Sequence, residues 1–551
     1  MAATIEDPPV FEPPAVPRPE LPDASSLQDR MPHWLRWPRS VAGATFVIGV
    51  IFLLTSHRPL WHTDVWGHLS YGRWIVEHGA LPQTEPFMPL AEGVRFVDTA
   101  WLSQVLGYLG YRAFGPSALQ FLYAAGVALA AGCLMWAVRR RTGSVIWGTV
   151  AVLAFLVVDW QQLVVARPQI GALACFTALF AIVVAKRPSR ADWFVVPALF
   201  AVWANLHGSF PVGLGLLAAC CAGRAFDVFR RTRRPGAMLH DRKARRLFVL
   251  LELAAVAALV NPYGLGLYVE VFAFSNSPNL ASLLDWEPLT LRMHQGRIAA
   301  AMALALVFLY RMTPRRIAAA EVLLLVGLGA AALWASRFLA WWAPVAAYYA
   351  TIHAAACWRH ARSVAAARDA DLSNDDELPD EAASSPRTGK WAVVTLGLAW
   401  ICFGYSSFGL TVLHGDTLPL AMRVGARTPL AAVDYLLANR DDIPAGMVFN
   451  TYEWGDYLLW AGNGEIPVFV ASHAHLLPTE IWQQYLAVSN RGAAWEEILA
   501  RHGVDSVLID RHRQAALAAS LEEHEDWRLS YSDGVASLFV RREPIKTILI
   551  E

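Results

Sequence analysis

Long apolar runs separated by short polar connections recur over most of this chain. The first run, 41–60, has the ~20 residues that a helix needs to cross a bilayer, and comparable runs follow as far as residue 413. We therefore predict a polytopic α-helical membrane protein with eleven transmembrane helices. Their predicted ranges are 41–60, 117–138, 145–163, 169–185, 192–206, 209–223, 247–260, 298–311, 319–336, 339–357 and 391–413.

Basic residues occur in every second connection between these runs. The basic connections are 139–141, 186–190, 224–246, 311–316 and 358–362. The positive-inside rule places all five in the cytoplasm. It follows that the N-terminus lies inside, and that the first loop, 61–116, and everything after residue 413 lie outside. Counting the apolar segment 99–115 as a span would move residues 139–141 outside, so we predict an interfacial helix there.

Shorter segments with alternating apolar positions replace the long runs after about residue 428. The segments 447–452, 466–472, 504–510, 527–533 and 535–542 fit strands, and 478–490 and 493–503 fit helices. We predict an extracytoplasmic α/β domain at 428–545. The proline-rich, acidic segment 1–40 is predicted to be a disordered cytoplasmic tail, and the polar insert 358–390 a flexible cytoplasmic loop.

The composition agrees with a membrane protein. The 551 residues are 56% hydrophobic and only 17% charged, whereas soluble domains have about 25% charged residues. The net charge is zero, which gives no indication of nucleic-acid binding. All six cysteines lie in apolar runs, so a disulfide framework in the C-terminal region is not expected.

The stretch HTDVWGHLSYGRWIVEHG, 62–79, opens the first outer loop with an unusual mixture of charged and aromatic residues. On a helix, Asp64, His68 and Tyr71 share one face. Asp64 follows the first span directly, within reach of water and the other outer loops, which favours a functional role. For His62 and His78, a solvated or tryptophan-packed role is favoured over chemistry.

Other polar residues stand at the outward ends of the predicted spans and in the first loop. They are Glu85, Asp98, Arg167, Asn205, His207, Asn261, Tyr263, Asp285, Glu287 and Arg337. So many groups at one membrane face predict a polar cavity there. Two interpretations of the arginines stay open, because an arginine at a helix end either snorkels to the interface or contacts a ligand phosphate. Asn205 is expected to close a turn, and His207 is undecided.

Two features of the C-terminal region also carry candidate chemistry. The run NTYEWGDYLLW, 450–460, offers Trp454 and its neighbours either as a platform for a sugar ring or as a turn packed on the membrane domain. His473 and His475 make only half of a metal site, and the spacing of His62, Asp64 and His68 does not match zinc. A divalent metal is therefore not indicated. The sequence has no phosphate-binding glycine loop and no nucleophile elbow.

The order of features around the first loop resembles the C-type (GT-C) glycosyltransferase superfamily. An acidic residue just past the first span, an amphipathic helix, a glycine and proline turn, and a second interfacial helix ending in FG read here as DVWGHLSYGRWIVEHGALPQTEPF…WLSQVLGYLGYRAFG, 64–115. The likeness is greatest to protein O-mannosyltransferases and aminoarabinose transferases. The sets RPQ, NLHGSF, NPYG and DWEP are also similar to bacterial membrane proteins described as glycosyltransferase-like.

The resemblance implies a bacterial enzyme of the cytoplasmic membrane and cell envelope that transfers a sugar from a polyprenyl-phosphate donor to an extracytoplasmic glycan, lipid or protein acceptor. Asp64 would be the catalytic base, with His68, Glu85 and Asp98 as further catalytic candidates. Arg167 and Arg337 would contact the donor phosphate. Substrate contacts are expected from His207, Asn261, Tyr263, Asp285, Glu287 and Trp454. No cofactor is required. The competing classes are a scaffold of an envelope complex and a lipid or polysaccharide transporter, although the repeats typical of transporters are not seen.

Overall fold

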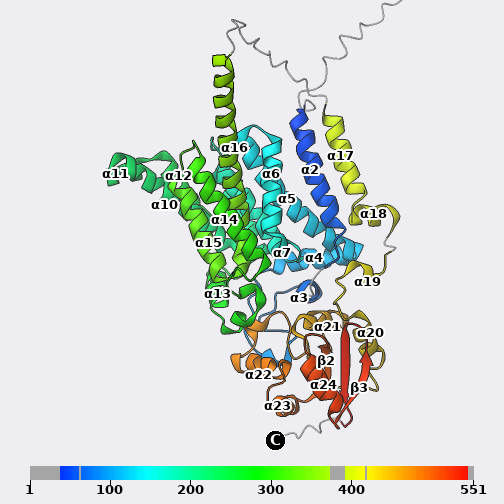
Figure 1. Ribbon diagram of the computed structural model, residues 1–551. Coiled ribbons are helices and arrows are strands. Elements are labelled where there is room, and N and C mark those ends of the chain that lie inside the picture. Colours follow the sequence, from blue (N-terminus) through cyan, green and yellow to red (C-terminus); the bar gives the residue numbers. More distant parts are fainter. Residues whose placement is uncertain (1–36, 61–63, 373–390, 416–417, 544–551) are drawn as a thin grey trace, which may run out of the picture.

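The protein has a helical bundle at one end and a small sheet domain at the other, with the first loop between them (Figure 1). The computed structural model describes residues 37–60, 64–372, 391–415 and 418–543. Nearly all of the predicted tail, 1–40, lies outside the described residues. The predicted flexible insert 358–390 is helical up to Leu372, because its alanine-rich first half continues helix α16.

Helices occupy all eleven predicted apolar ranges. They are α2 (Arg39–Ser56), α5 (Pro116–Thr142), α6 (Val145–Val158) with α7 (Trp160–Leu163), α8 (Gln169–Val183), α9 (Asp192–Leu206), α10 (Phe210–Thr232), α12 (Arg242–Ala257), α14 (His294–Met312), α15 (Ala319–Trp334), α16 (Leu339–Leu372), and α17 (Ala392–Gly404) with α18 (Ser407–His414). Two further helices, α11 (Pro235–His240) and α13 (Leu265–Ser275), were not predicted.

Not all of these helices are long enough to cross a bilayer unaided. By length and apolar composition, three described helices qualify, namely α2, α5 and α10, and a fourth span is counted if α17 and α18 are taken together. The helical membrane-type fold is therefore confirmed, while the count of eleven spans stays a prediction.

The last predicted span, 391–413, is broken rather than continuous. Helix α17 ends at Gly404, and α18 leaves it at an angle of 77°. Ser406 caps the new helix by accepting a hydrogen bond from the backbone N–H of Gly409 at 3.0 Å. A serine in this position stabilises a fresh helix start, so the chain turns along the bundle instead of continuing straight.

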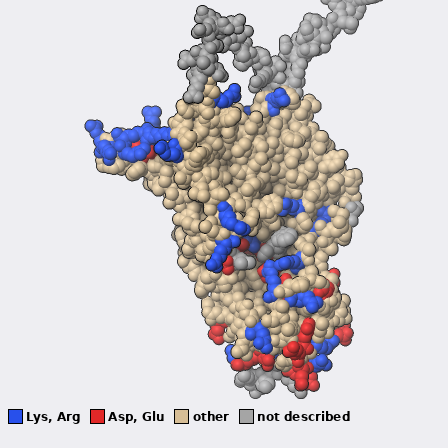
Figure 2. Space-filling view, in the orientation of Figure 1, with Lys and Arg blue, Asp and Glu red and all other residues tan. Residues whose placement is uncertain are grey.

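Charge separates the two ends of the molecule. Figure 2 shows a broad uncharged belt between a basic end and a C-terminal end that carries both signs. The basic end includes Arg139, Arg140 and Arg141 in the last turn of α5, and Arg230 and Arg231 in the last turn of α10. This distribution is typical of a membrane protein with a basic cytoplasmic face, and the orientation itself stays a prediction.

The first loop forms a helical layer between the bundle and the sheet domain. It contains α3 (Asp64–His78), the 3₁₀ turn η2 (Pro89–Ala91) and α4 (Trp101–Phe114), which confirms a helix in the predicted interfacial segment. Helices α3 and α4 approach closely because Gly72 has no side chain, and a Cβ there would lie 2.2 Å from the carbonyl oxygen of Gln104.

The C-terminal region contains a four-stranded sheet in the order β1-β2-β4-β3. Its strands are β1 (Met447–Asn450), β2 (Val504–Asp510), β3 (Trp527–Ser532) and β4 (Ala536–Arg541). β1 and β2 are parallel, and the two other pairings are antiparallel. The predicted strand 466–472 makes only an isolated bridge through Val468. The surrounding helices are α19 (Leu420–Arg423), α20 (Leu430–Ala438), α21 (Gly455–Ala461), α22 (Thr479–Ser489), α23 (Trp495–Arg501) and α24 (Ala515–Glu523).

Polar contacts anchor this sheet domain to the bundle. The amide of Asn279 donates to the carbonyls of Ala474 and Leu477 at 2.8 and 2.9 Å. The indole of Trp482 donates to Ser282 at 2.8 Å. Because Asn279 is buried and its donors are satisfied, the loop 473–477 is held against the segment 279–282 of the bundle.

Candidate functional site

Three charged side chains meet where the bundle, the first loop and the sheet domain join. Asp64 begins α3, Arg167 lies in the link between α7 and α8, and Asp285 lies in the 3₁₀ turn η4 (Leu284–Trp286). The Nε of Arg167 is 2.6 Å from Oδ2 of Asp64, and its Nη1 donates to Oδ2 of Asp285. Arg167 thus bridges two carboxylates from segments more than one hundred residues apart.

Burial and the arginine act against each other on Asp285. Burial raises the pKa of this carboxyl, but the charge and hydrogen bond of Arg167 outweigh it, and the pKa falls below its usual value. Asp285 is therefore ionised at neutral pH. Burial lowers the pKa of Arg167, but the charges of Asp64 and Asp285 outweigh it and raise the pKa. The guanidinium therefore stays charged.

Arg337 supplies a second guanidinium beside this cluster. It lies in the 3₁₀ turn η5 (Ser336–Phe338), and its Cζ stands 4.6 Å from the centre of the Trp286 ring. The hydroxyl of Ser336 donates to the carbonyl of Asp285 at 3.2 Å, which ties this turn to η4. Within the described residues Arg337 has no carboxylate within 4.0 Å. Arg337 is half-buried, and the charges of Asp285 and Asp64 act on it from beyond ion-pair distance.

Four half-buried histidines in this region are neutral. Burial lowers the pKa of His68 and His475 to about 4 and that of His207 to about 3, and it lowers the pKa of His473 well below the ordinary value. The rings of His68 and His473 are 6.4 Å apart, and those of His473 and His475 are 5.6 Å apart. Neutral imidazoles offer hydrogen bonds to a ligand without adding charge.

The tautomer of His207 follows from its partners. The backbone N–H of Ser209 donates to Nδ1 of His207 at 3.1 Å, so that nitrogen is an acceptor and Nε2 carries the proton. Asn205 nearby accepts from the indole of Trp101 at 2.9 Å and donates to the carbonyls of Ala201 and Val260. Asn205 thus joins the end of α9 to Trp101 and Val260 rather than closing, as the sequence predicted, the turn that follows α9.

The sheet domain contributes Tyr452 to the same region. Its hydroxyl donates to the carbonyl of Ser472 at 2.9 Å, and its backbone N–H donates to the hydroxyl of Tyr485 at 2.8 Å. Burial, and then the nearby charge of Asp64, raise the pKa of Tyr452 well above its usual value. The phenol therefore stays protonated next to the charge cluster.

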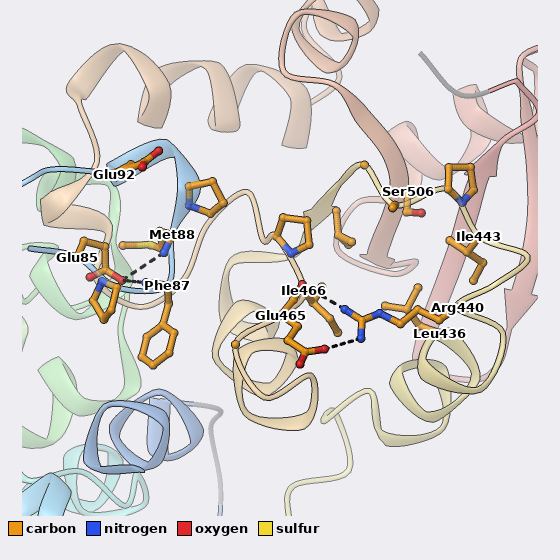
Figure 3. Close-up of a pocket in the computed structure, with 18 of the residues that line it drawn as sticks. Glu85, Phe87, Met88, Glu92, Leu436, Arg440, Ile443, Glu465, Ile466 and Ser506 are labelled. Carbon is orange, nitrogen blue, oxygen red and sulfur yellow. Dashed lines mark hydrogen bonds and ion pairs between the residues drawn. The ribbon is translucent and has the colours of Figure 1, made fainter. Parts of the chain in front are cut away.

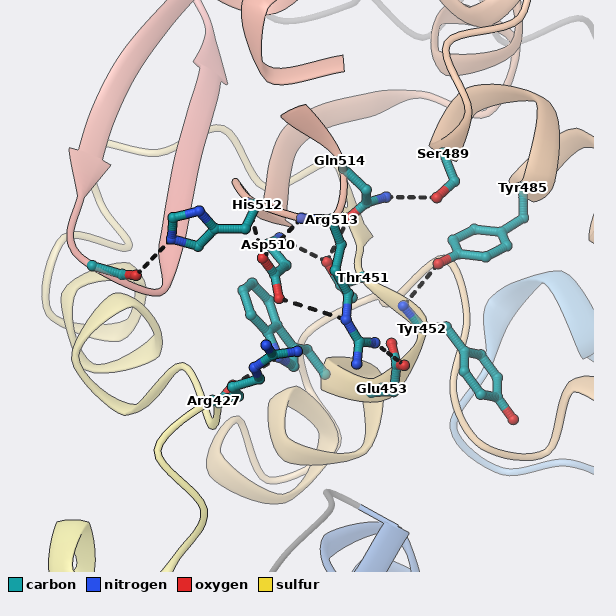
Figure 4. A network of polar contacts seen from close by, with 12 residues as sticks. Arg427, Thr451, Tyr452, Glu453, Tyr485, Ser489, Asp510, His512, Arg513 and Gln514 are labelled. Atoms are coloured by element: carbon teal, nitrogen blue, oxygen red, sulfur yellow. Dashed lines mark hydrogen bonds and ion pairs between the residues drawn. The ribbon is translucent and has the colours of Figure 1, made fainter. Parts of the chain in front are cut away.

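A polar network fixes the backbone that carries Tyr452 (Figure 4). Thr451 donates to Gln514 at 2.6 Å and accepts from the backbone N–H of Asp510 at 2.9 Å. Gln514 in turn donates to Ser489 at 2.7 Å. Arg513 and Glu453 form an ion pair beside it. The satisfied network holds the turn after β1 in one conformation, which positions Tyr452 toward the first loop.

Asp98, a catalytic candidate in the first loop, is linked to the region of the cluster through Gln104 and His68. Asp98 is 2% exposed and accepts hydrogen bonds from the backbone of Ala100 and the side chain of Gln104, both at 3.0 Å. Burial raises its pKa to about 7. The amide of Gln104 also lies 3.4 Å from Nδ1 of His68, so it links Asp98 to that histidine.

Glu85 is held by its own hydrogen bonds rather than by the cluster. It accepts from the hydroxyl of Tyr71 at 2.8 and 2.9 Å and from the backbone N–H of Phe87 at 2.9 Å, while burial raises its pKa. Glu85 also lines a cleft of about 650 Å³ between the first loop and the sheet domain, with the ion pair of Arg440 and Glu465 on the opposite wall (Figure 3).

Three predicted substrate contacts make hydrogen bonds within the protein, and their contact with a substrate stays a prediction. Asn261 bonds within its own turn, donating to Ala258 at 2.7 Å and accepting from the backbone of Tyr263 at 2.7 Å. The hydroxyl of Tyr263 accepts from the backbone N–H of Asp98 at 3.1 Å. For Glu287, the contact found is its backbone carbonyl, which accepts from Ser336 at 2.9 Å.

Trp454 is a core residue, and the platform interpretation is wrong for it. Its side chain is 3% exposed, and the indole N–H donates to the carbonyl of Arg427 at 3.0 Å. A sugar would find no free ring face there. His78, in contrast, stacks on Trp74 at 4.1 Å, as a tryptophan-packed histidine should, while His62 lies outside the described residues.

No metal site emerges in the described part of the chain. It contains no group of three or more His, Cys, Asp or Glu side chains arranged to hold a metal ion. The contributions that the sequence did not assign to this site are the ring of Trp286 under Arg337, and Tyr452 and His473 from the sheet domain. The sequence contains the motifs to which these residues belong, but it does not show that the motifs lie close together in the folded protein.

Comparison with known proteins identifies the fold. No family model and no curated protein sequence matches the chain. The oligosaccharyltransferase of Archaeoglobus fulgidus in its apo form superposes with a TM-score of 0.53 at 13% identity, over 87% of this chain and 71% of that one. ArnT from Cupriavidus metallidurans bound to undecaprenyl phosphate gives 0.48 at 15% identity, over 91% and 97%. Arabinofuranosyltransferase AftD from mycobacteria gives 0.47 at 14% identity, over 91% and 40%.

The conclusion about the fold rests on the oligosaccharyltransferase, since the other two scores are lower. This chain shares the fold of that oligosaccharyltransferase, so the fold implied by the resemblance of its first loop is confirmed. At 13% identity the likeness concerns the fold alone.

Proposed function

We propose that this protein is a glycosyltransferase that moves a sugar from a polyprenyl-phosphate donor to an acceptor at the outer membrane face. The observation that carries the proposal is the arrangement of Asp64, Arg167, Asp285 and Arg337 at the junction of bundle and sheet domain. The fold shared with an oligosaccharyltransferase supports it. A reaction in which an anionic lipid phosphate leaves a sugar is helped by a cation that stabilises the leaving group and a carboxylate that takes the proton of the acceptor.

Arg337 is the better candidate for the donor phosphate. Arg167 already neutralises two aspartates, so a phosphate would have to compete with them. Arg337 lies over the face of Trp286, and among the described residues no carboxylate is within 4.0 Å of it, although the charge of Asp285 acts on it from farther away. A guanidinium without a carboxylate partner in a half-buried site gains more from a phosphate, because a charge-assisted bond replaces no existing ion pair.

Asp64 is proposed to take the proton of the acceptor. The acceptor hydroxyl oxygen bonds to the anomeric carbon, the bond from that carbon to the phosphate oxygen breaks, and the hydroxyl proton passes to the Asp64 carboxylate. Polyprenyl phosphate departs with the electron pair and is stabilised by Arg337. Arg167 acts as a positioning residue that fixes Asp64 at the start of α3.

The neutral histidines and Tyr452 suit recognition of a sugar. His68, His207 and His473 add hydrogen-bonding groups without charge, and Tyr452 adds a protonated phenol. Sugars are recognised by such uncharged donors and acceptors together with ring faces. The C-terminal domain would thus complete the site from the extracytoplasmic side of a bacterial inner membrane.

The proposal is tested with the full-length protein purified in detergent. Lipids extracted from it are analysed by mass spectrometry for polyprenyl-linked sugars. The protein is then incubated with sugars linked to undecaprenyl phosphate and a cell-envelope extract, and free undecaprenyl phosphate is measured. We expect time-dependent release with at least one donor. If no preparation binds or consumes any lipid-linked sugar, the enzyme assignment is wrong and a scaffold role takes its place.

A further inference from the structure

A second cavity lies at the opposite end of the bundle from the charge cluster. It has a volume of about 470 Å³ and is walled by α2, α5 and α17, which run side by side in Figure 1. Trp136, which lines it, is 41% exposed, so the cavity opens to the surface of the bundle. Apart from Thr45 and Arg139, the lining residues are apolar or glycine.

Small residues create the space. Gly132 lies on the cavity wall, and a Cβ added there would meet no atom within 4 Å. Ala128 and Ala399 also line the cavity with small side chains. Gly49 lets α2 approach α17, because a Cβ there would lie 2.6 Å from the sulfur of Cys402. The α5 wall runs from Ala128 to Arg139, which is about 16 Å at 1.5 Å per residue. That is about half of the ~30 Å hydrocarbon core, or one leaflet.

Arginines gather at one end of this cavity. Arg139 lines it and donates to Ser40 at 2.9 Å. Arg140 lies 4.6 Å from the ring of Trp136, and Arg39 lies 5.7 Å from the ring of Trp391. Among the described residues none of these three arginines has a carboxylate partner within 4.0 Å, and helices α2, α5 and α17 contain no Asp or Glu.

We propose that this cavity binds an anionic phospholipid from the leaflet at the basic face. One acyl chain would fill the apolar cavity, and the phosphate would lie on Arg39, Arg139 and Arg140. The length of the cavity matches one leaflet. The three arginines at its end, which have no carboxylate within 4.0 Å among the described residues, would attract an anionic headgroup. This site is independent of the proposed transfer reaction, because it lies at the other end of the bundle from Asp64.

Native mass spectrometry of the full-length protein tests the proposal. The protein is titrated in detergent with dioleoylphosphatidylglycerol, which is anionic, or dioleoylphosphatidylcholine, which is zwitterionic with no net charge. We expect one tightly bound phosphatidylglycerol, with affinity at least about tenfold above that for phosphatidylcholine. Gly132→Leu should weaken its binding at least about tenfold, because the new side chain occupies the cavity. Replacing all three arginines by glutamine should abolish the preference between the lipids.

Gly327→Leu is the matched control. Gly327 is an exposed glycine within α15, also with no atom within 4 Å of an added Cβ, but it lies outside the cavity. This variant should bind phosphatidylglycerol as the wild type does. Circular dichroism of both leucine variants checks that the helices persist. Equal binding by Gly132→Leu and Gly327→Leu would overturn the proposal, as would equal affinity for the two lipids. A lipid-free dimer that Gly132→Leu disrupts would assign the cavity to a second copy of the chain.

Discussion

Replacing Asp64 by asparagine separates a catalytic carboxylate from a structural one. The substitution keeps the size of the side chain, and its amide oxygen still accepts a hydrogen bond from Nε of Arg167. Arg167 also keeps its ion pair with Asp285, so no buried charge is left without a partner. Since Asp64 is partly exposed, we expect a loss in the free energy of unfolding of only about 1–2 kcal/mol.

The loss of activity should be far larger. Without a base for the acceptor proton, the rate of transfer should fall about 10²- to 10⁴-fold. That range corresponds to about 3–5 kcal/mol in the activation free energy. The readout is the rate at which undecaprenyl phosphate is released from a donor that the wild-type protein consumes. Thermal unfolding of the same preparation, followed by intrinsic fluorescence, shows whether the variant is folded.

Two further variants make this result specific. Glu77→Gln changes an exposed carboxylate on the same helix and should keep the wild-type rate. Arg337→Met should raise the KM for the donor about tenfold or more, because the phosphate loses the guanidinium proposed to bind it. Full activity of a folded Asp64→Asn protein would refute the assignment of the base. Glu85 and Asp98 would then be the next carboxylates to test.

Three other predictions concern topology, packing and pH. Reporter fusions at Gly236 and Gly492 should report the cytoplasm and the exterior, and the same compartment for both would overturn the topology. Trp454→Ala should lower the free energy of unfolding by about 3–5 kcal/mol, because it leaves a cavity in the core, and it should make the C-terminal domain sensitive to protease. An unchanged protease pattern would argue for a surface role. The pKa of Asp98 is raised to about 7, so the folded state favours its protonated form. This contribution to stability is complete below about pH 4 and is lost as the pH rises to 7 and above. Asp98→Asn should remove the fall in thermal stability between pH 5 and 7, and an unchanged pH profile would contradict the pKa.

The sequence by itself determined where the helices lie. An apolar run of sufficient length forms a helix in a membrane whatever its neighbours are, because every backbone group must find a partner within the segment. For this reason all eleven ranges, and the interfacial helix of the first loop, could be read directly from hydropathy. The same local logic failed for the range 391–413, where a serine cap outweighs the continuity of the apolar pattern. It also missed the short helix α13.

Only the tertiary structure decided which polar residues act together. Asp64, Arg167 and Asp285 were each visible as polar groups at helix ends, but their ion pairs depend on how three distant segments pack. Arg167 and Arg337 look alike in sequence. In the described part of the chain they differ because two carboxylates form ion pairs with Arg167, whereas Arg337 lies over the ring of Trp286 with no carboxylate within 4.0 Å. Trp454 likewise reads as a surface aromatic until its neighbours bury it. Hydropathy is a property of each segment, whereas burial and charge pairing belong to pairs of segments, and pairs are fixed only by packing.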